Sequence, residues 1–167
     1  MDAYLDIETT GLSRYAHEIT VIGVGVGAGS NLRVTQLYDD NISAASLRDL
    51  LRGVDKVFTF NGSRFDLPFI QYRLGVDIGG IVAHQDLMFD CWRSGLRGGY
   101  KAVERTLGIA RQLPSMNGYK AVLLWQDYKA RNDQNALETL LAYNREDVSN
   151  LPLLQAALSR RVPIRRR

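Results

Sequence analysis

The chain has 167 residues, of which 46% are hydrophobic, and this is enough for one globular domain with a substantial core. Its 21 basic and 18 acidic residues give a net charge of +3, a mild excess that fits an anionic partner. Cys91 is the only cysteine, so an intrachain disulfide is excluded and a reducing, cytoplasmic location is expected. The apolar runs are far shorter than the roughly 20 residues of a membrane span, so we expect no membrane partner.

The first 60 residues predict three strands followed by a change to alternating helix and strand. Residues 3–7 and 19–27 have the apolar character of buried strands. Residues 32–38 alternate apolar and polar side chains after a turn at 29–31, which predicts a strand paired with the second one as a hairpin. A helix is predicted from Ser43, a suitable N-cap, to Leu51, and a strand at 57–60.

The second half of the chain is predicted to be mainly helical. A helix at 65–74 and a short fifth strand at 81–84 precede helical segments at 100–107, about 122–129, and 135 to about 159. Pro152 is expected to bend or interrupt the last of these. The pattern predicts an α/β fold with a five-stranded mixed sheet flanked by helices, in one domain over residues 1–160 with a basic tail at 161–167.

Asp6 and Glu8 lie at the end of the first predicted strand. Side chains two positions apart on a strand project from the same face, so these carboxyl groups lie side by side. Two adjacent carboxylates repel each other and are costly to bury unless cations neutralise them. The pair therefore indicates a metal site, although a solvated strand end is an alternative because such triplets are common.

A second carboxylate, Asp66, follows a turn at Asn61 where a predicted strand passes into a helix. In α/β proteins such strand ends are where ligands bind, so Asn61 and Asp66 are expected to face one crevice. The alternative for Asp66 is a carboxylate that is favoured by the dipole of the helix N-terminus.

Tyr143 and Asp147 are the third candidate pair, on the last long helix. They are four residues apart and therefore share one face of that helix, with room for a water molecule between them. Glu146 points in a different direction from Asp147, so only one of these two acids needs to serve the site. Taken in isolation, Tyr143 is better interpreted as a core or amphipathic aromatic residue with its hydroxyl at the surface.

These three segments, in this order, resemble the DnaQ-like, or DEDD, 3′ to 5′ exonucleases of the ribonuclease H-like superfamily over nearly the whole chain. The motifs of the tyrosine branch match Asp6 with Glu8, Asp66, and Tyr143 with Asp147. The histidine branch would have a histidine at position 142, and this chain has Ala142 there. The strings at 6–12, 59–69, 84–87, 101–108 and 143–148 are most similar to the YprB-like subgroup.

The resemblance implies hydrolysis of phosphodiester bonds with two divalent ions. Asp6 would bridge both ions, Glu8 and Asp147 would complete the ion that activates water, and Asp66 would support the ion at the leaving oxygen. Oxygen-only ligands favour Mg²⁺ or Mn²⁺ over Zn²⁺. Tyr143 would orient the attacking water, because a free phenol has a pKa near 10.

The expected substrate is single-stranded DNA or RNA with a free 3′ end. By resemblance, the backbone after the first motif contacts the terminal nucleotide, and Asn61 helps to hold the strand; the residues after the motif are Thr9, Thr10, Gly11 and Leu12. Basic residues concentrate in two groups, Arg93, Arg97, Lys101 and Arg105, and then Arg160, Arg161 and Arg165 to Arg167. Both groups fit either phosphate contact or plain solvated surface, with Lys101 as the substrate-binding candidate.

Two other functions fit the same residues. One is a ribonuclease H-like module that binds nucleic acid without cutting it, and the complete set of acidic residues argues against this. The other is a metal-dependent endonuclease of the same fold, and the pairing of Tyr143 with Asp147 favours an exonuclease instead.

Overall fold

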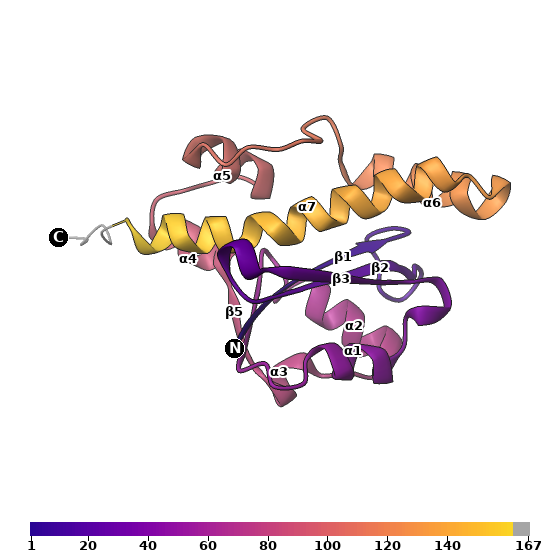
Figure 1. Cartoon of the computed structure of the whole chain (residues 1–167), viewed down its shortest axis with the longest axis horizontal. Helices are drawn as coiled ribbons and strands as arrows, with labels where there is room; N and C mark the ends of the chain where they lie inside the picture. The colour runs from indigo at the N-terminus through magenta and orange to yellow at the C-terminus, as the bar shows by residue number, and fades with distance from the viewer. Residues whose placement is uncertain (162–167) are drawn as a thin grey trace.

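The computed structural model describes residues 1–161, which form one sheet between two layers of helices (Figure 1). The sheet has the strand order β3-β2-β1-β4-β5. Its strands are β1 (Asp2–Thr9), β2 (Ile19–Val26), β3 (Arg33–Tyr38), β4 (Lys56–Thr59) and β5 (Ala83–Asp86). The first three strands pair antiparallel, and β4 and β5 continue the sheet parallel to β1, so the predicted mixed α/β sheet is confirmed.

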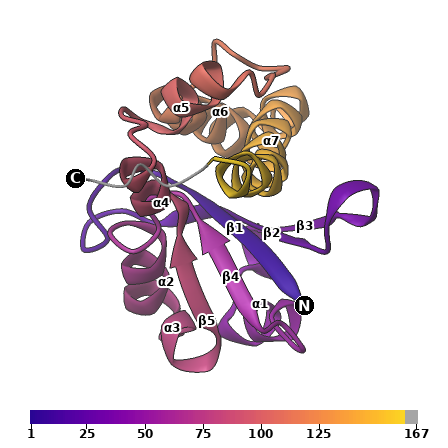
Figure 2. The same cartoon turned by 90° about the vertical axis from the view of Figure 1, so that its left-hand side faces the viewer.

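The helices cover the two faces of the sheet separately, as the end-on view in Figure 2 shows. One face carries α1 (Ala44–Leu50), α2 (Asp66–Leu74) and α3 (Ile78–Ile81). The other face carries α4 (Leu87–Arg93), α5 (Tyr100–Leu107), α6 (Gly118–Arg131) and α7 (Gln134–Ser159). Short 3-10 turns, η1 (Gly29–Asn31) and η2 (Asp39–Asn41), flank β3.

Strand β1 divides its side chains between these two layers. Ala3, Leu5 and Ile7 are buried in the apolar core under α1, α2 and α3. Tyr4 belongs to the second core, which α7 and α4 cover, and Asp6 and Glu8 follow it at the two-residue spacing of a strand. The strand therefore stabilises the fold with one face and presents carboxylates on the other.

Two glycines of β2 allow α7 to lie close to the sheet. Gly23 pairs with Asp6 and Gly25 with Tyr4, so both glycines face the α7 layer. A β-carbon on Gly23 would lie 2.3 Å from Asn144 Oδ1 and 2.8 Å from Val148 Cγ2. Glycine is therefore required there by the close approach of the helix, and this contact sets how near α7 comes to β1.

Several predicted boundaries need correction. The fifth strand is Ala83–Asp86 rather than 81–84, because residues 78–81 form the single turn α3, which the Asp77 side chain caps. Helix α6 is longer than predicted, and α4 was not separately predicted. Pro152, which was predicted to bend or interrupt the last helix, lies inside α7 without interrupting it, and α7 is one continuous helix in Figure 1.

Residues 1–161 include no helix that is both long and apolar enough to cross a membrane. The predicted basic tail at 161–167 lies outside the described residues except for Arg161. Cys91 is fully buried in the core under α7.

Candidate active site

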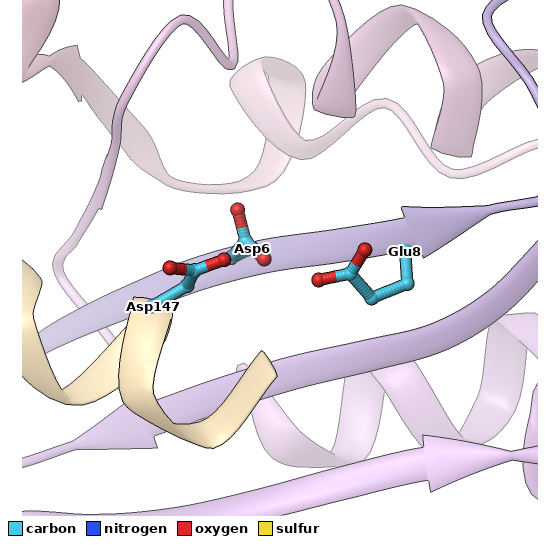
Figure 3. Close-up of side chains that lie close together, drawn as sticks. All are labelled: Asp6, Glu8 and Asp147. Atoms are coloured by element: carbon cyan, nitrogen blue, oxygen red, sulfur yellow. The ribbon is translucent and has the colours of Figure 1, made fainter. Parts of the chain in front are cut away.

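Three carboxyl groups meet where β1 and α7 pack together. Oxygen atoms of Asp6, Glu8 and Asp147 all lie within 4.8 Å of one another. Figure 3 shows Asp147, on α7, directed at Asp6, with the Glu8 carboxyl group turned towards them from the same strand. The fold thus brings Asp147 next to two residues near the start of the chain. All of the possible ligand atoms in this cluster are carboxylate oxygens.

Asn144 fixes α7 against this part of β1. Its side-chain amide donates hydrogen bonds to the backbone oxygen of Asp6 at 3.2 Å and to Asp6 Oδ2 at 3.1 Å. Its own Oδ1 accepts a hydrogen bond from Gln36 on β3 at 2.8 Å. Asn144 is fully buried, and it orients the Asp6 carboxyl group directly. Sequence reasoning assigned it no role, although it faces the sheet one turn before Val148.

Asp66 lies in the same cavity, outside the close trio. It is the first residue of α2, is 4% exposed, and accepts a hydrogen bond from the backbone N–H of Ile7 at 3.0 Å. The turn before it is held by Asp86, whose carboxyl oxygens accept hydrogen bonds from the backbone N–H groups of Asn61 and Ser63 at 2.8 and 3.0 Å. Asp86 therefore shapes the turn that positions Asp66.

The acidic residues share a cavity of about 630 Å³ with the residues that follow the first motif. Its lining includes Asp6, Glu8, Thr9, Thr10, Gly11, Leu12, Asn61, Phe65, Asp66, Tyr119, Tyr143 and Asp147. All of the predicted site residues except Lys101 are therefore brought to one place. Leu12 is 87% exposed at the rim, whereas Phe65 also packs against Phe69 in the apolar core.

The threonines after the first motif use their hydroxyl groups inside their own loop. Thr9 Oγ1 donates to the backbone oxygen of Gly11 at 2.7 Å, and Thr10 Oγ1 accepts from the backbone N–H of Glu18 at 3.0 Å. These bonds give the loop a defined shape beside the carboxylates. A ligand in the cavity would therefore contact the exposed Leu12 side chain of this loop rather than hydroxyl groups that are free of other bonds.

The crowded carboxyl groups resist ionisation. Burial raises the pKa of Asp6 well above its ordinary value, and Asp147, Glu8 and Asp66 add to the rise. Burial and the charge of Asp147 likewise raise the pKa of Glu8. Burial raises the pKa of Asp66 to about 7. The pKa of Asp147 rises to about 6, because burial outweighs the opposing effect of Arg111. A divalent cation would relieve this repulsion, so the donor set fits such an ion.

Tyr143 stays protonated in this environment. Burial, followed by the charges of Asp147 and Glu8, raises the pKa of its hydroxyl group far above the ordinary value. Its side chain is 7% exposed and lines the cavity one helical turn before Asp147. The hydroxyl can therefore donate or accept a hydrogen bond there, but it is not a base near neutral pH.

Arg111, in the loop between α5 and α6, is a central residue that the sequence did not predict. Its Nη2 binds Asp147 Oδ1 and its Nε binds Glu104 Oε2, each at 2.5 Å. Glu104 is 1% exposed and also accepts a hydrogen bond from Asn150 at 2.8 Å. Arg111 thus links the α5 layer to the acidic cluster and holds one oxygen of Asp147.

The other predicted basic contacts are arranged differently. Lys101 lies beside the acidic cavity rather than on an open surface, with its Nζ 4.9 Å from the centre of the Tyr143 ring. Arg93 pairs with Asp90 on α4, and Arg97 lies over the Trp92 ring. Neither arginine lines the acidic cavity. Arg165 to Arg167 lie outside the described residues.

The fold and this acidic site are those of a nuclease-type domain, and residues 3–159 match the RNase_H_2 family, described as the RNase_H superfamily. The chain therefore belongs to the RNase H superfamily. In sequence it matches none of the curated proteins with which it was compared.

Solved nuclease structures share the fold at low sequence identity. Brucella melitensis NrnC bound to pGG is 22% identical, with a TM-score of 0.64. The match covers 96% of this chain and 72% of the NrnC chain. NrnC with bound Mg²⁺ is 19% identical with a TM-score of 0.66 and the same coverage. The family B DNA polymerase from the hyperthermophilic archaeon Pyrobaculum calidifontis is 17% identical with a TM-score of 0.65, over 97% of this chain and 26% of its own.

Proposed function

We propose that this protein is a metal-dependent 3′ to 5′ exonuclease that hydrolyses single-stranded DNA or RNA from a free 3′ end. The observation that carries the proposal is the meeting of Asp6, Glu8 and Asp147 within 4.8 Å, on one cavity with Asp66 and Tyr143. Buried carboxyl groups at this spacing are hard to explain as parts of a stable core without cations. Within the superfamily we assign the chain to the DnaQ-like, tyrosine-type group and its YprB-like subgroup.

Asp6, Glu8, Asp66 and Asp147 would hold two Mg²⁺ or Mn²⁺ ions. Bound divalent ions would acidify a water molecule and stabilise the charge that grows on the leaving oxygen. Asp6 would bridge the two ions, and the hydrogen bond from Asn144 orients its carboxyl group within 4.8 Å of the carboxyl oxygens of Glu8 and Asp147. The NrnC structure with bound Mg²⁺ supports this choice of ion.

The remaining residues of the site would orient the strand and the water. Tyr143 holds the attacking water through its protonated hydroxyl group, in line with its raised pKa. The loop of Thr9, Thr10, Gly11 and Leu12 receives the terminal nucleotide, and Leu12 is exposed at the point where it would meet a base. Asn61 lines the same cavity and would help to hold the strand. NrnC bound to pGG is the structural neighbour that supports a nucleic-acid ligand.

The direct test is digestion of a 5′-labelled single strand with Mg²⁺ or Mn²⁺. The proposal predicts a ladder of products shortened one nucleotide at a time from the 3′ end, while a closed circle of the same sequence stays intact. A cut circle would identify an endonuclease instead. Binding of the strand without any metal-dependent shortening would identify a non-catalytic module. Matched DNA and RNA strands in the same assay determine the sugar preference.

A second measurement tests the metal site without using activity. Mn²⁺ should raise the melting temperature of the native protein, because an ion that binds only the folded state stabilises it. The double variant Asp6→Ala, Asp147→Ala should show no such rise. Equal shifts in both proteins would place the ion elsewhere.

A further inference from the structure

A second cavity of about 460 Å³ adjoins the acidic one on the side of α5. The two cavities share Asp6, Phe60, Asn61, Gly118, Tyr143 and Asp147 in their linings. The second cavity adds Lys101, Arg111 and the start of α5. A chain molecule that passes the acidic cluster from the first cavity would therefore meet two cationic side chains, Lys101 and Arg111, that do not line the first cavity.

Lys101 brings a covered ammonium group to this space. Its Nζ is buried and has no hydrogen-bond partner within residues 1–161. The nearest described interaction is with the face of the Tyr143 ring, 4.9 Å from the ring centre. An ammonium group has three donors, and burying them unsatisfied is costly, so the position calls for an acceptor.

Arg111 adds a second donor that lacks a partner. Its side chain is only 6% exposed, and its Nε and Nη2 are bound to Glu104 and Asp147. Its Nη1 is buried without a hydrogen bond in the described part of the chain, and lies 3.6 Å from Glu146 Oε2, beyond hydrogen-bond distance. Arg111 also pairs with Asp147, so its guanidinium group partly offsets the charge of that carboxylate beside the second cavity.

The first turn of α5 lines the same space. Gly99 precedes the helix without any side-chain cap, and Gly99, Tyr100, Lys101 and Ala102 all line the cavity. The free backbone N–H groups at a helix start carry partial positive charge and bind anions. Two buried cationic donors and an uncapped helix start thus face one cavity.

We infer that the second cavity is a phosphate subsite, which binds the phosphodiester group one linkage 5′ of the scissile bond. The inference rests on the proposed function for the direction of the strand. With the 3′-terminal nucleotide in the first cavity and the scissile phosphate at the carboxylates, the next phosphate falls on the Lys101 side. The subsite would fix the register of the strand and screen the acidic cluster from its negative charge.

The test combines one charge deletion in the protein with one in the strand. A methylphosphonate at the second linkage from the 3′ end removes the charge of the phosphate that the subsite would bind. Binding is measured by fluorescence anisotropy with Ca²⁺ in place of Mg²⁺, and a gel checks that the strand stays uncut. The native protein should bind this strand about tenfold more weakly than the unmodified one, the loss expected for a hydrogen bond to a charged group.

Lys101→Gln should bind the unmodified strand about tenfold more weakly and show no further loss with the methylphosphonate strand. Lys101→Arg, which keeps the charge, should restore most of the difference between the strands. Lys120→Gln is the matched control, since it makes the same charge change at an exposed residue whose Nζ donates to Ser115 and which lines neither cavity. It should behave like the native protein.

A methylphosphonate penalty of the same size in the native protein and in Lys101→Gln would overturn the subsite, and so would no penalty at all. Either result with normal metal-dependent digestion leaves the proposed function intact. If the native protein does not digest any strand, inorganic phosphate still tests the cavity. It should raise the melting temperature of the native protein and of Lys120→Gln more than that of Lys101→Gln, and equal shifts would overturn the subsite.

Discussion

The two faces of the sheet are built from the same strands but have different compositions. The face under α1, α2 and α3 is filled with aliphatic side chains and Phe69. On the α7 face, the buried side chains include Glu8, Glu104, Asn144 and Asp147. Successive residues of β1 point to opposite faces. Stabilising apolar side chains such as Leu5 therefore alternate along the strand with carboxylates such as Asp6.

This division shows where the stability of the domain comes from. Buried acidic groups with raised pKa values destabilise the ionised folded protein, whereas each fully buried aliphatic side chain adds roughly 1.5–3 kcal/mol. The apolar cores, of which the largest cluster fills the face under α1, α2 and α3, therefore offset the strain of the acidic site. Substitutions at neighbouring positions of β1 should consequently have opposite effects on stability and activity.

The largest expected effect is that of Asp6→Asn compared with Leu5→Ala. Asp6→Asn should lower activity by roughly 10³-fold, about 4 kcal/mol of transition-state stabilisation, and raise the melting temperature of the metal-free protein because one crowded charge is gone. Leu5→Ala should cost about 2–5 kcal/mol of unfolding free energy and leave the activity of the folded protein unchanged.

Urea unfolding in EDTA measures the stability of the metal-free protein, and digestion at low temperature measures the activity of the folded protein. A lower metal-free stability for Asp6→Asn would mean that Asp6 is part of the scaffold rather than a strained ligand. A large loss of activity in folded Leu5→Ala would mean that the apolar face also tunes the site.

The contact between β2 and α7 sharpens the comparison, with an intermediate expected effect. In Gly23→Ala the new methyl group overlaps Asn144 Oδ1 and Val148 Cγ2, so α7 must move away from β1. Overpacking of this kind costs about 1–3 kcal/mol. Because Asn144 also orients Asp6, the variant should bind Mn²⁺ more weakly, as measured by calorimetry.

Gly79→Ala in α3 is the control for this substitution. Its new methyl group would lie 3.7 Å from Asp77 Oδ1, an ordinary contact, and it is far from the acidic cluster in the fold. It should be neutral or slightly stabilising and leave Mn²⁺ binding unchanged. Equal Mn²⁺ affinity in Gly23→Ala and the native protein would show that α7 can shift without affecting the metal ligands.

The sequence predicted the apolar face and the main acidic residues well, because both follow simple periods. The two-residue period of β1 predicts Leu5 on one face and Asp6 with Glu8 on the other, and the four-residue spacing of a helix puts Tyr143 with Asp147. The second, third and fourth strands and α2 were predicted almost to the residue. The fifth strand was misplaced because Ile81 is apolar, whereas the Asp77 cap decides that residues 78–81 form a turn.

The polar network around the site could not be predicted, because it has no period. Arg111 lies in an irregular loop, and its partners Glu104 and Asp147 come from two different helices. Lys101 was assigned to strand binding from its charge alone, and only the packing of α5 against Tyr143 shows that its Nζ is covered. Asp86 likewise becomes interpretable only when β5 and the turn at Asn61 are adjacent.

The pH dependence of stability also separates the two faces. The pKa of Asp66 in the folded protein is raised to about 7 from its ordinary value of 3.8. Between these two pH values the folded state therefore binds more protons than the unfolded state. Stability from this group is therefore fully present below about pH 4 and is lost as the pH rises through 7. Without metal, the melting temperature of the native protein should fall relative to that of Asp66→Asn between pH 5 and 8.

Asparagine can still accept the hydrogen bond from Ile7, so the comparison isolates the charge at this position. The difference between native protein and Asp66→Asn should be widest near pH 8 in EDTA and should shrink or reverse with Mn²⁺, because the ion stabilises the ionised carboxylates. Leu5→Ala provides the contrast: its melting temperature should lie below that of the native protein by a nearly constant amount across the same range. A pH-independent difference for Asp66→Asn would mean that Asp66 is already ionised in the metal-free protein, and that the acidic face is less strained than its burial indicates.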